Sequence, residues 1–172
     1  MNRILATLAR RRVSLGFLAA IAALVLARPT WETWRAGLVI AVAGEAVRIW
    51  AAGHLEKSRE VTRSGPYRLT GHPLYAGSVL IAIGIAVASR SAAVVLLVVV
   101  YMAATISAAI ATEEAFLRRT FGDAYDRYRR SEAEPVTRRF SLERARRNRE
   151  YRAVAGVLAG FALLALKVLV SI

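Results

Sequence analysis

Cysteine is absent from the sequence, and the only histidines among its 172 residues are His54 and His72. Without cysteine the chain has no disulfide, no thiolate nucleophile and no Cys-based metal site, and two histidines are too few for a histidine-rich metal centre. The patterns G-x-G, H-E-x-x-H and G-x-S-x-G are missing as well. These absences argue against dinucleotide-binding proteins, P-loop proteins and hydrolases, and we predict no metal ligands.

Acidic residues are also scarce: 12 Asp and Glu stand against 25 Lys and Arg, so the formal net charge is +13. Yet 56% of the residues are hydrophobic, and the mean hydropathy is +0.42. Because the charges are segregated from the apolar runs, this composition is typical of a small polytopic membrane protein. The positive residues cluster at the edges of the apolar runs, where anionic lipid binds them. We therefore expect the bilayer, and no nucleic acid, as a partner.

Five apolar segments predict an all-α fold, a polytopic membrane helix bundle of about five transmembrane helices in a single domain, residues 1–172. The spans are expected at about 13–27, 34–53, 73–89, 91–112 and 153–170. The first is short enough to be a signal peptide, but we interpret it as a membrane helix. Only Arg90 separates the third span from the fourth, which predicts an antiparallel hairpin. The small residues Gly77 and Gly84 would permit close helix contact.

Lys and Arg are distributed unequally over the loops. Twelve lie in residues 113–152, four in residues 54–72 and four in the N-terminal arm, whereas the opposite loops hold only Arg28, Arg35 and Arg90. By the positive-inside rule, the N-terminus and the segments 54–72 and 113–152 are cytoplasmic. The two most distinctive segments therefore share the face of the membrane that meets soluble cofactors.

Two features within the spans each have two interpretations. Glu45 and Arg48 lie one turn apart on one face of the second span. They are interpreted either as a structural ion pair that fixes helix packing or as residues that line a site. Gly156 and Gly160 form a GxxxG pattern in the last span, which suits packing within the chain or a homodimer. All four interpretations stay open at this point.

The loop before the third span has the sequence V-T-R-S-G-P-Y-R-L-T-G-H-P-L-Y-A-G, residues 61–77. Gly65-Pro66 predicts a turn, because glycine tolerates positive φ and proline fixes its own. Pro73 suits the first turn of a helix, where free N–H groups and a partial positive charge favour an anion. The segment predicts a rigid polar loop that leads directly into a membrane helix.

A second polar segment follows the fourth span and begins with the acidic pair Glu113-Glu114. Beyond this pair, intervals of three and four residues predict an apolar and aromatic stripe on one helix face. Its members are Leu117, Phe121, Tyr125 and Tyr128. We expect this stripe to lie on the bilayer surface or to cover a cavity.

Together the two segments resemble a known family. G-P-Y-R-x-x-x-H-P-x-Y-x-G at 65–77, with E-E-x-x-L-x-x-x-F-G-x-x-Y-x-x-Y at 113–128, is similar to the isoprenylcysteine carboxyl methyltransferase and phospholipid methyltransferase superfamily. R-x-W-A-x-G-H-L-x-K at 48–57 also resembles bacterial members, so we expect a bacterial inner-membrane protein. The likeness covers about residues 48–130. Gly71 departs from it, because the family usually has Arg before His-Pro, and Arg68 is a nearby partial substitute.

The resemblance implies S-adenosylmethionine as methyl donor, S-adenosylhomocysteine as product, and a cofactor site at the cytoplasmic face of the helices. In such a site the carboxylate of S-adenosylmethionine would lie near His72 and the helix start at Pro73. The glutamates would pair with the ammonium group or accept from the ribose, and the tyrosine rings would lie beside the sulfonium. The implied cofactor-binding residues are Gly65, Pro66, Tyr67, His72, Pro73, Tyr75, Gly77, Glu113 and Glu114. The implied catalytic residues are His72, Arg68 and Glu114, and the implied substrate-binding residues are Arg48, His54, Tyr125, Tyr128 and Arg129.

The expected reaction is methyl transfer to a membrane lipid or lipid-like acceptor that enters laterally from the bilayer. A phospholipid amine, an isoprenoid carboxylate and a quinone-like or other lipid hydroxyl are all open as acceptors. An amine or hydroxyl must lose a proton, and His72, His54 and the glutamates are the candidate bases. The alternative hypothesis is a catalytically silent membrane scaffold that retains the fold. The two hypotheses differ in whether the cofactor binds.

Overall fold

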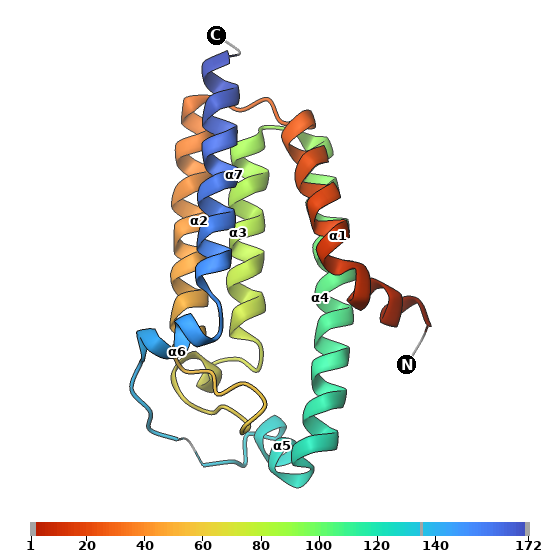
Figure 1. Cartoon of the computed structure of the whole chain (residues 1–172), viewed down its shortest axis with the longest axis vertical. Coiled ribbons are helices and arrows are strands. Elements are labelled where there is room, and N and C mark those ends of the chain that lie inside the picture. The colour runs from red at the N-terminus through yellow and green to blue at the C-terminus, as the bar shows by residue number, and fades with distance from the viewer. Residues whose placement is uncertain (1–2, 135, 171–172) are drawn as a thin grey trace.

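The computed structural model describes residues 3–134 and 136–170, with side chains from Ser14 onward, and all regular structure within these ranges is helical, as predicted. The long helices are α1 (Arg3–Leu26), α2 (Trp31–Ala52), α3 (Pro73–Ser89), α4 (Ala92–Phe121) and α7 (Tyr151–Val170). The short elements are the 3₁₀ turn η1 (Gly65–Arg68), α5 (Asp123–Arg129) and α6 (Leu142–Arg147). The short elements gather at one end of the bundle, here called the motif end (Figure 1).

Each predicted span corresponds to a long helix. Two of them, α4 and α7, are long and apolar enough to cross a membrane by length and composition. Helix α3 has the predicted bounds, because Pro73 begins it and Arg90 ends it in a left-handed conformation. Helix α4 continues beyond the predicted span to Phe121, because charged residues do not interrupt a helix that leaves the apolar layer. The predicted stripe on one helix face through Tyr128 is wrong, because Gly122 turns the chain and Tyr125 and Tyr128 belong to the separate helix α5. The five-span topology remains a prediction.

Helices α2 and α3 pack closely through glycines. A Cβ atom on Gly37 would lie 2.3 Å from the carbonyl oxygen of Gly84, and one on Gly44 would lie 2.7 Å from that of Gly77. The missing side chains therefore allow the two backbones to approach, as small residues do in membrane helix pairs. The expected close contact at Gly77 and Gly84 is present, with α2 as the partner helix.

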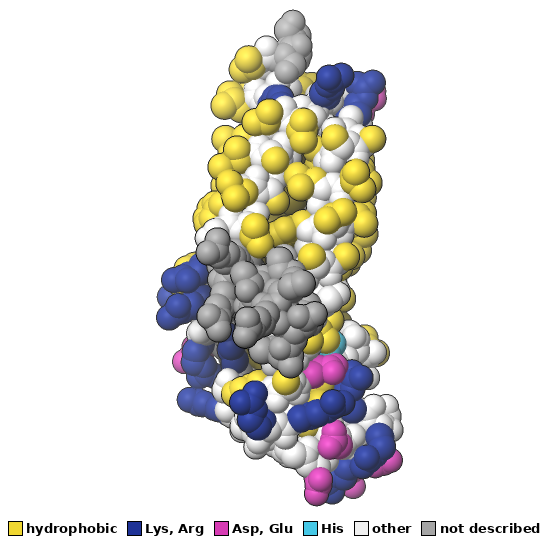
Figure 2. Space-filling view, turned by 90° about the vertical axis from the view of Figure 1, so that its right-hand side faces the viewer, with side chains coloured by type: hydrophobic (Ala, Val, Ile, Leu, Met, Phe, Trp, Pro, Cys, Tyr) yellow, Lys and Arg dark blue, Asp and Glu magenta, His cyan; other side chains and the backbone are white. Residues whose placement is uncertain are grey.

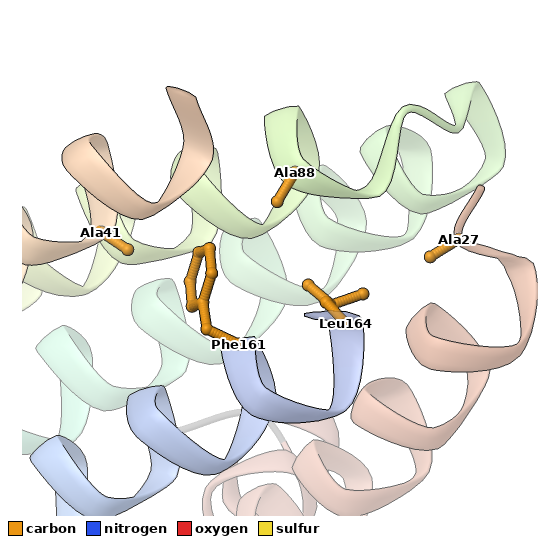
Figure 3. Close-up of a cluster of buried hydrophobic side chains, with 5 residues drawn as sticks. All are labelled: Ala27, Ala41, Ala88, Phe161 and Leu164. Atoms are coloured by element: carbon orange, nitrogen blue, oxygen red, sulfur yellow. The ribbon is translucent and has the colours of Figure 1, made fainter. Parts of the chain in front are cut away.

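The buried core lies near the end opposite the motif end, where α1, α2, α3 and α7 meet. Trp34 of α2 packs edge-on against Phe161 of α7, with ring centroids 6.0 Å apart, and its Nε1 donates to the Phe161 carbonyl over 2.9 Å. The small alanines let the helices come close, and Phe161 fills the space between them. The buried residues of this cluster are Ala27, Ala41, Ala88, Phe161 and Leu164 (Figure 3).

The surface separates apolar from charged side chains along the bundle axis. On the face that carries α1 and α4, hydrophobic side chains cover the middle, whereas Lys and Arg gather toward the two ends (Figure 2). Leu96, Val99 and Val100 of α4 are 58–66% exposed. An apolar belt bounded by charge is what a bilayer covers, so the chain has the surface of a membrane protein. The side chains of the N-terminal arginines used for orientation lie outside the described residues.

The segment after α5 returns across the motif end and binds the end of α2. The Asn148 amide donates to the carbonyl oxygens of Ala52 and Leu55, both over 2.9 Å, where helix-end carbonyls lack helical partners. Arg144 Nε donates to Glu56 Oε1 over 2.8 Å. No helix was predicted here, yet Ser141 caps α6 by accepting from the Arg144 backbone N–H. This segment ties the region before α7 to the loop after α2.

Candidate functional site

The first motif forms a compact loop over the end of α2. Gly65 has a φ of +56°, and a Cβ atom there would lie 2.6 Å from the His54 ring, so both conformation and space require glycine. His54 Nδ1 lies 2.9 Å from the Trp50 carbonyl oxygen, which makes it the protonated nitrogen, and the residue is buried. The structure therefore places His54, a predicted substrate-binding residue, beneath the loop as a packing residue.

His72 lies between the two acidic side chains of α4. Its Nε2 is 3.4 Å from Glu114 Oε1, and its Nδ1 is 3.9 Å from Glu113 Oε2. Nδ1 is buried and has no hydrogen-bond partner among the described residues. Because His72 directly precedes Pro73, the first residue of α3, the first motif meets the acidic pair of the second at this helix start. We call these three side chains the His72 cluster.

Helix α5 adds a guanidinium group to this cluster. Arg129 Nη1 is 2.9 Å from Glu114 Oε1, so Glu114 faces both an imidazole and a guanidinium. Glu113 is more open, with its side chain 42% exposed. Gly122, with a φ of +48° and a ψ of −124°, turns the chain sharply between α4 and α5, in a conformation that favours glycine.

Three tyrosines connect α5 to the first motif or lie beside that contact. Tyr128 donates its hydroxyl to the Tyr67 carbonyl oxygen over 2.8 Å, and Tyr125 is buried next to Tyr128. Burial raises the pKa of Tyr128 to about 12 and also raises the pKa values of Tyr67 and Tyr125. All three phenols therefore stay protonated at neutral pH. The hydrogen bond from Tyr128 to the Tyr67 carbonyl oxygen holds α5 against the loop.

Arg48 lies in a buried ionic network on the α2 side of the site. Its Nε donates to Glu150 Oε1 over 2.7 Å, and its Nη1 donates to Ser78 Oγ and, over 3.4 Å, to the Leu74 carbonyl oxygen. Glu45 Oε2 is 4.0 Å from Arg48 Nε, and both Glu45 oxygens are buried with no hydrogen-bond partner among the described residues. The local pair of Glu45 and Arg48 is thus the weaker contact.

A groove of about 550 Å³ runs between α3, α4 and α7, at the level of the apolar belt. This volume lies within the range of about 300–1,000 Å³ that is usual for small-molecule sites. Arg48, Tyr75 and Ser78 line the end near the motifs, and Ile85 and Met102 belong to the largely apolar wall beyond them. The Tyr75 ring lies 5.7 Å from the His72 ring, so the polar end of the groove adjoins the His72 cluster.

The remaining predicted residues lie around this arrangement. Pro66 is buried within η1, whereas Arg68 at the end of η1 is exposed. Gly77 faces α2, where a Cβ atom would lie 2.6 Å from Arg48 Cγ. At Gly71 a Cβ atom would lie 4.0 Å from the Tyr128 hydroxyl, so a long side chain there would meet α5.

Sequence reasoning missed Glu150 and Ser78. Glu150 is 102 residues from Arg48 and carries no local signal of that contact. Ser78 offered a weak signal, because it is a hydroxyl residue in an otherwise uncharged apolar helix. In the described part of the chain, no group of three or more His, Cys, Asp or Glu side chains is arranged to hold a metal ion.

Comparison with known proteins places the chain in a family. The phospholipid methyltransferase family matches residues 31–124, which is more than half of the chain and covers α2 to the start of α5. The chain belongs to this family, which confirms the resemblance carried by the two motifs.

The curated relative found is the cobalt-zinc-cadmium resistance protein CzcN of Cupriavidus metallidurans. The two sequences are 30% identical over 122 residues, a region that covers 66% of this chain. The chain spans only 56% of the length of that relative. No solved structure matches the chain.

Proposed function

We propose that this protein is an integral-membrane, S-adenosylmethionine-dependent methyltransferase that acts on a lipidic or amphipathic acceptor. One observation carries the proposal: the His72 cluster adjoins, through Tyr75, the polar end of a groove at the level of the apolar belt. Membership of the phospholipid methyltransferase family supplies the reaction class. The adjoining sites would bring a water-soluble methyl donor next to an acceptor that stays in the bilayer.

The cluster fits the polar groups of S-adenosylmethionine. The open carboxylate of Glu113 would pair with the ammonium group or accept from the ribose, because Glu114 is already engaged by Arg129. The free N–H groups of the Arg129 guanidinium would bind the donor carboxylate. When bound, S-adenosylmethionine supplies an electrophilic methyl group on a sulfonium, and the nearby Tyr75 ring favours such a cation.

His72 is the proposed general base when the acceptor must lose a proton. Carboxylates face both ring nitrogens, but Glu114 Oε1 is 3.4 Å from Nε2 whereas Glu113 Oε2 is 3.9 Å from Nδ1, so in this proposal Nε2 carries the ring proton and Nδ1 is left as the acceptor. Nδ1 has no hydrogen-bond partner among the described residues, so its lone pair could take the proton of an acceptor hydroxyl or amine once the buried ring is uncovered. Glu114 and Arg129 would hold the ring in this tautomer and orientation.

The charge distribution supports an orientation with the motif end in the cytoplasm of a bacterial cell and the helices in the inner membrane. Residues 113–152 contain twelve Lys and Arg, whereas Arg28, Arg35 and Arg90 lie toward the opposite end. In this orientation the donor reaches the His72 cluster from the cytoplasm, and the acceptor enters the groove laterally.

The proposal is tested by methyl transfer in lipid nanodiscs. Purified protein is incubated with tritiated S-adenosylmethionine and a bacterial lipid extract, and the lipid classes are then separated. We expect label in one lipid class, which identifies the acceptor as an amine, carboxylate or hydroxyl. His72→Ala should abolish the transfer, whereas Asp123→Asn, an exposed change outside the cluster, should not. No labelled lipid with folded wild-type protein would contradict the proposal.

A further inference from the structure

Helix α7 lies outside residues 31–124, which match the family, yet it forms one wall of the groove. Its contribution consists of Ala153, Gly156 and Val157. Gly156 also belongs to the GxxxG pattern with Gly160, for which packing within the chain and a homodimer were the two interpretations. The position of α7 points to a third use of Gly156, as part of the groove lining.

Three side-chain contacts fix how α7 faces its neighbours. Glu150, just before the helix, binds Arg48 over 2.7 Å. Near the middle, the Phe161 carbonyl oxygen accepts from Trp34 Nε1 over 2.9 Å. Near the far end, Lys167 Nζ donates to the Leu24 carbonyl oxygen over 2.7 Å, at the end of α1. Contacts at the start, middle and end hold the rotation of α7, so Gly156 stays on the groove side.

Gly156 is not needed for close packing within the chain. A Cβ atom on Gly156 or Gly160 would meet nothing within 4 Å, whereas one on Gly84 would lie 2.5 Å from the Gly37 carbonyl oxygen. Gly84 therefore lets two helix backbones approach, whereas Gly156 and Gly160 leave open space beside α7. At Gly156 that open space belongs to the groove.

We infer that Gly156 is a specificity-determining residue, which keeps the α7 side of the groove open for the apolar chain of the methyl acceptor. The inference rests on the proposed function. The acceptor's polar head would lie at the polar end of the groove, which Arg48, Tyr75 and Ser78 line. From Tyr75 to Ile85 the α3 wall is about 15 Å long at 1.5 Å per residue, which suits an extended acyl or isoprenoid chain.

Two leucine substitutions on one helix test the inference. Gly156→Leu would place a branched side chain in the groove, and Gly160→Leu is the matched control, because Gly160 does not line the groove. The probe is stearic acid with a diazirine on its acyl chain, photolysed in nanodiscs that contain each protein. Mass spectrometry then measures the labelling of the α4 peptide around Met102, which lies across the groove.

We expect Gly156→Leu to reduce the labelling around Met102 several-fold and Gly160→Leu to leave it at the wild-type level. Unchanged labelling in Gly156→Leu would overturn the inference. An equal loss in both variants would overturn it too, because that is the result for a helix–helix contact through GxxxG.

A calorimetric titration with S-adenosylhomocysteine separates this inference from the proposed function. Gly156 lies away from the His72 cluster, so both leucine variants should bind the product as the wild type does. If the wild type does not bind it, the methyltransferase proposal fails, while the labelling still decides whether Gly156 sets the width of the groove.

Discussion

Arg48→Met and Glu150→Gln should have very unequal effects on stability, because two carboxylates share one guanidinium. Arg48 Nε is 2.7 Å from Glu150 and 4.0 Å from Glu45, and the Arg48 and Glu150 side chains are only 20% and 7% exposed. Arg48→Met removes the cation and leaves both acids buried beside each other. Glu150→Gln removes one acid, keeps an oxygen that accepts from Arg48, and leaves Arg48 beside Glu45.

The magnitudes follow from what each change leaves unpaired. Breaking a buried ion pair by removing one partner costs about 3–5 kcal/mol, so Arg48→Met should lower Tm by about 6–20 °C. Glu150→Gln exchanges an ion-paired hydrogen bond for one from the Arg48 guanidinium to a neutral amide oxygen, which costs about 1 kcal/mol, or about 2–4 °C. The double variant should be more stable than Arg48→Met alone, because one of the two uncompensated acids is gone.

Thermal unfolding followed by far-UV circular dichroism in one detergent measures all three variants. Arg130→Met is the matched control: its guanidinium is 2.9 Å from Glu132, a similar distance, but both side chains are more than half exposed, so no measurable change is expected. Equal losses for Arg48→Met and Glu150→Gln would refute this reasoning. A double variant less stable than Arg48→Met would refute it as well.

Three further predictions concern other parts of the chain. Gly84→Ala places a Cβ atom 2.5 Å from a backbone oxygen of α2, so it should lower the free energy of unfolding by about 1–3 kcal/mol. Gly160→Ala should leave it unchanged in the same thermal unfolding experiment, and equal losses of stability in the two variants would contradict the packing argument. His72→Ala and Glu114→Ala should each weaken the binding of S-adenosylhomocysteine about tenfold or more, since each removes a charge-assisted contact in the His72 cluster. Calorimetry measures this binding, and wild-type affinity in both folded variants would show that the site is elsewhere. Burial acts to raise the pKa of Glu56, but a hydrogen bond and the charges of nearby arginines outweigh it and hold the pKa below the ordinary 4.5. Because the folded pKa is the lower one, the stabilisation is present above pH 4.5 and is lost as the pH falls through the folded pKa. Glu56→Gln should therefore flatten the acid limb of the Tm–pH curve, and an unchanged limb would rule out this contribution.

The sequence predicted those parts of the fold that depend on local chemistry. Pro73 and Arg90 bound α3 as expected, because proline at a helix start and a charged break after an apolar run act within a few residues. Glycines at 77 and 84 indicated close packing, but α2 could be identified as the partner helix only from the structure. Spacing along one helix shows which side chains share a face, and it does not show which helix that face meets.

The candidate site was predicted only in outline, because local motifs do not show which distant residues their side chains contact. The two motifs placed His72 near Glu113 and Glu114, and the structure brings these three side chains together. Glu45 and Arg48 were interpreted either as a structural ion pair or as the lining of a site, and no sequence pattern pointed to Glu150, with which Arg48 makes its shorter contact. That contact depends on how the arginine-rich segment folds back over α2, which a local pattern does not encode.

The central claim is that the motif end binds the methyl donor, and calorimetric titration of the wild-type protein with S-adenosylhomocysteine tests it most directly. The protein should be purified in a mild detergent and shown to be folded by cooperative thermal unfolding. The account predicts saturable binding in the micromolar range at one site per chain. No binding by the folded protein would contradict it and would favour a membrane scaffold that retains the family fold.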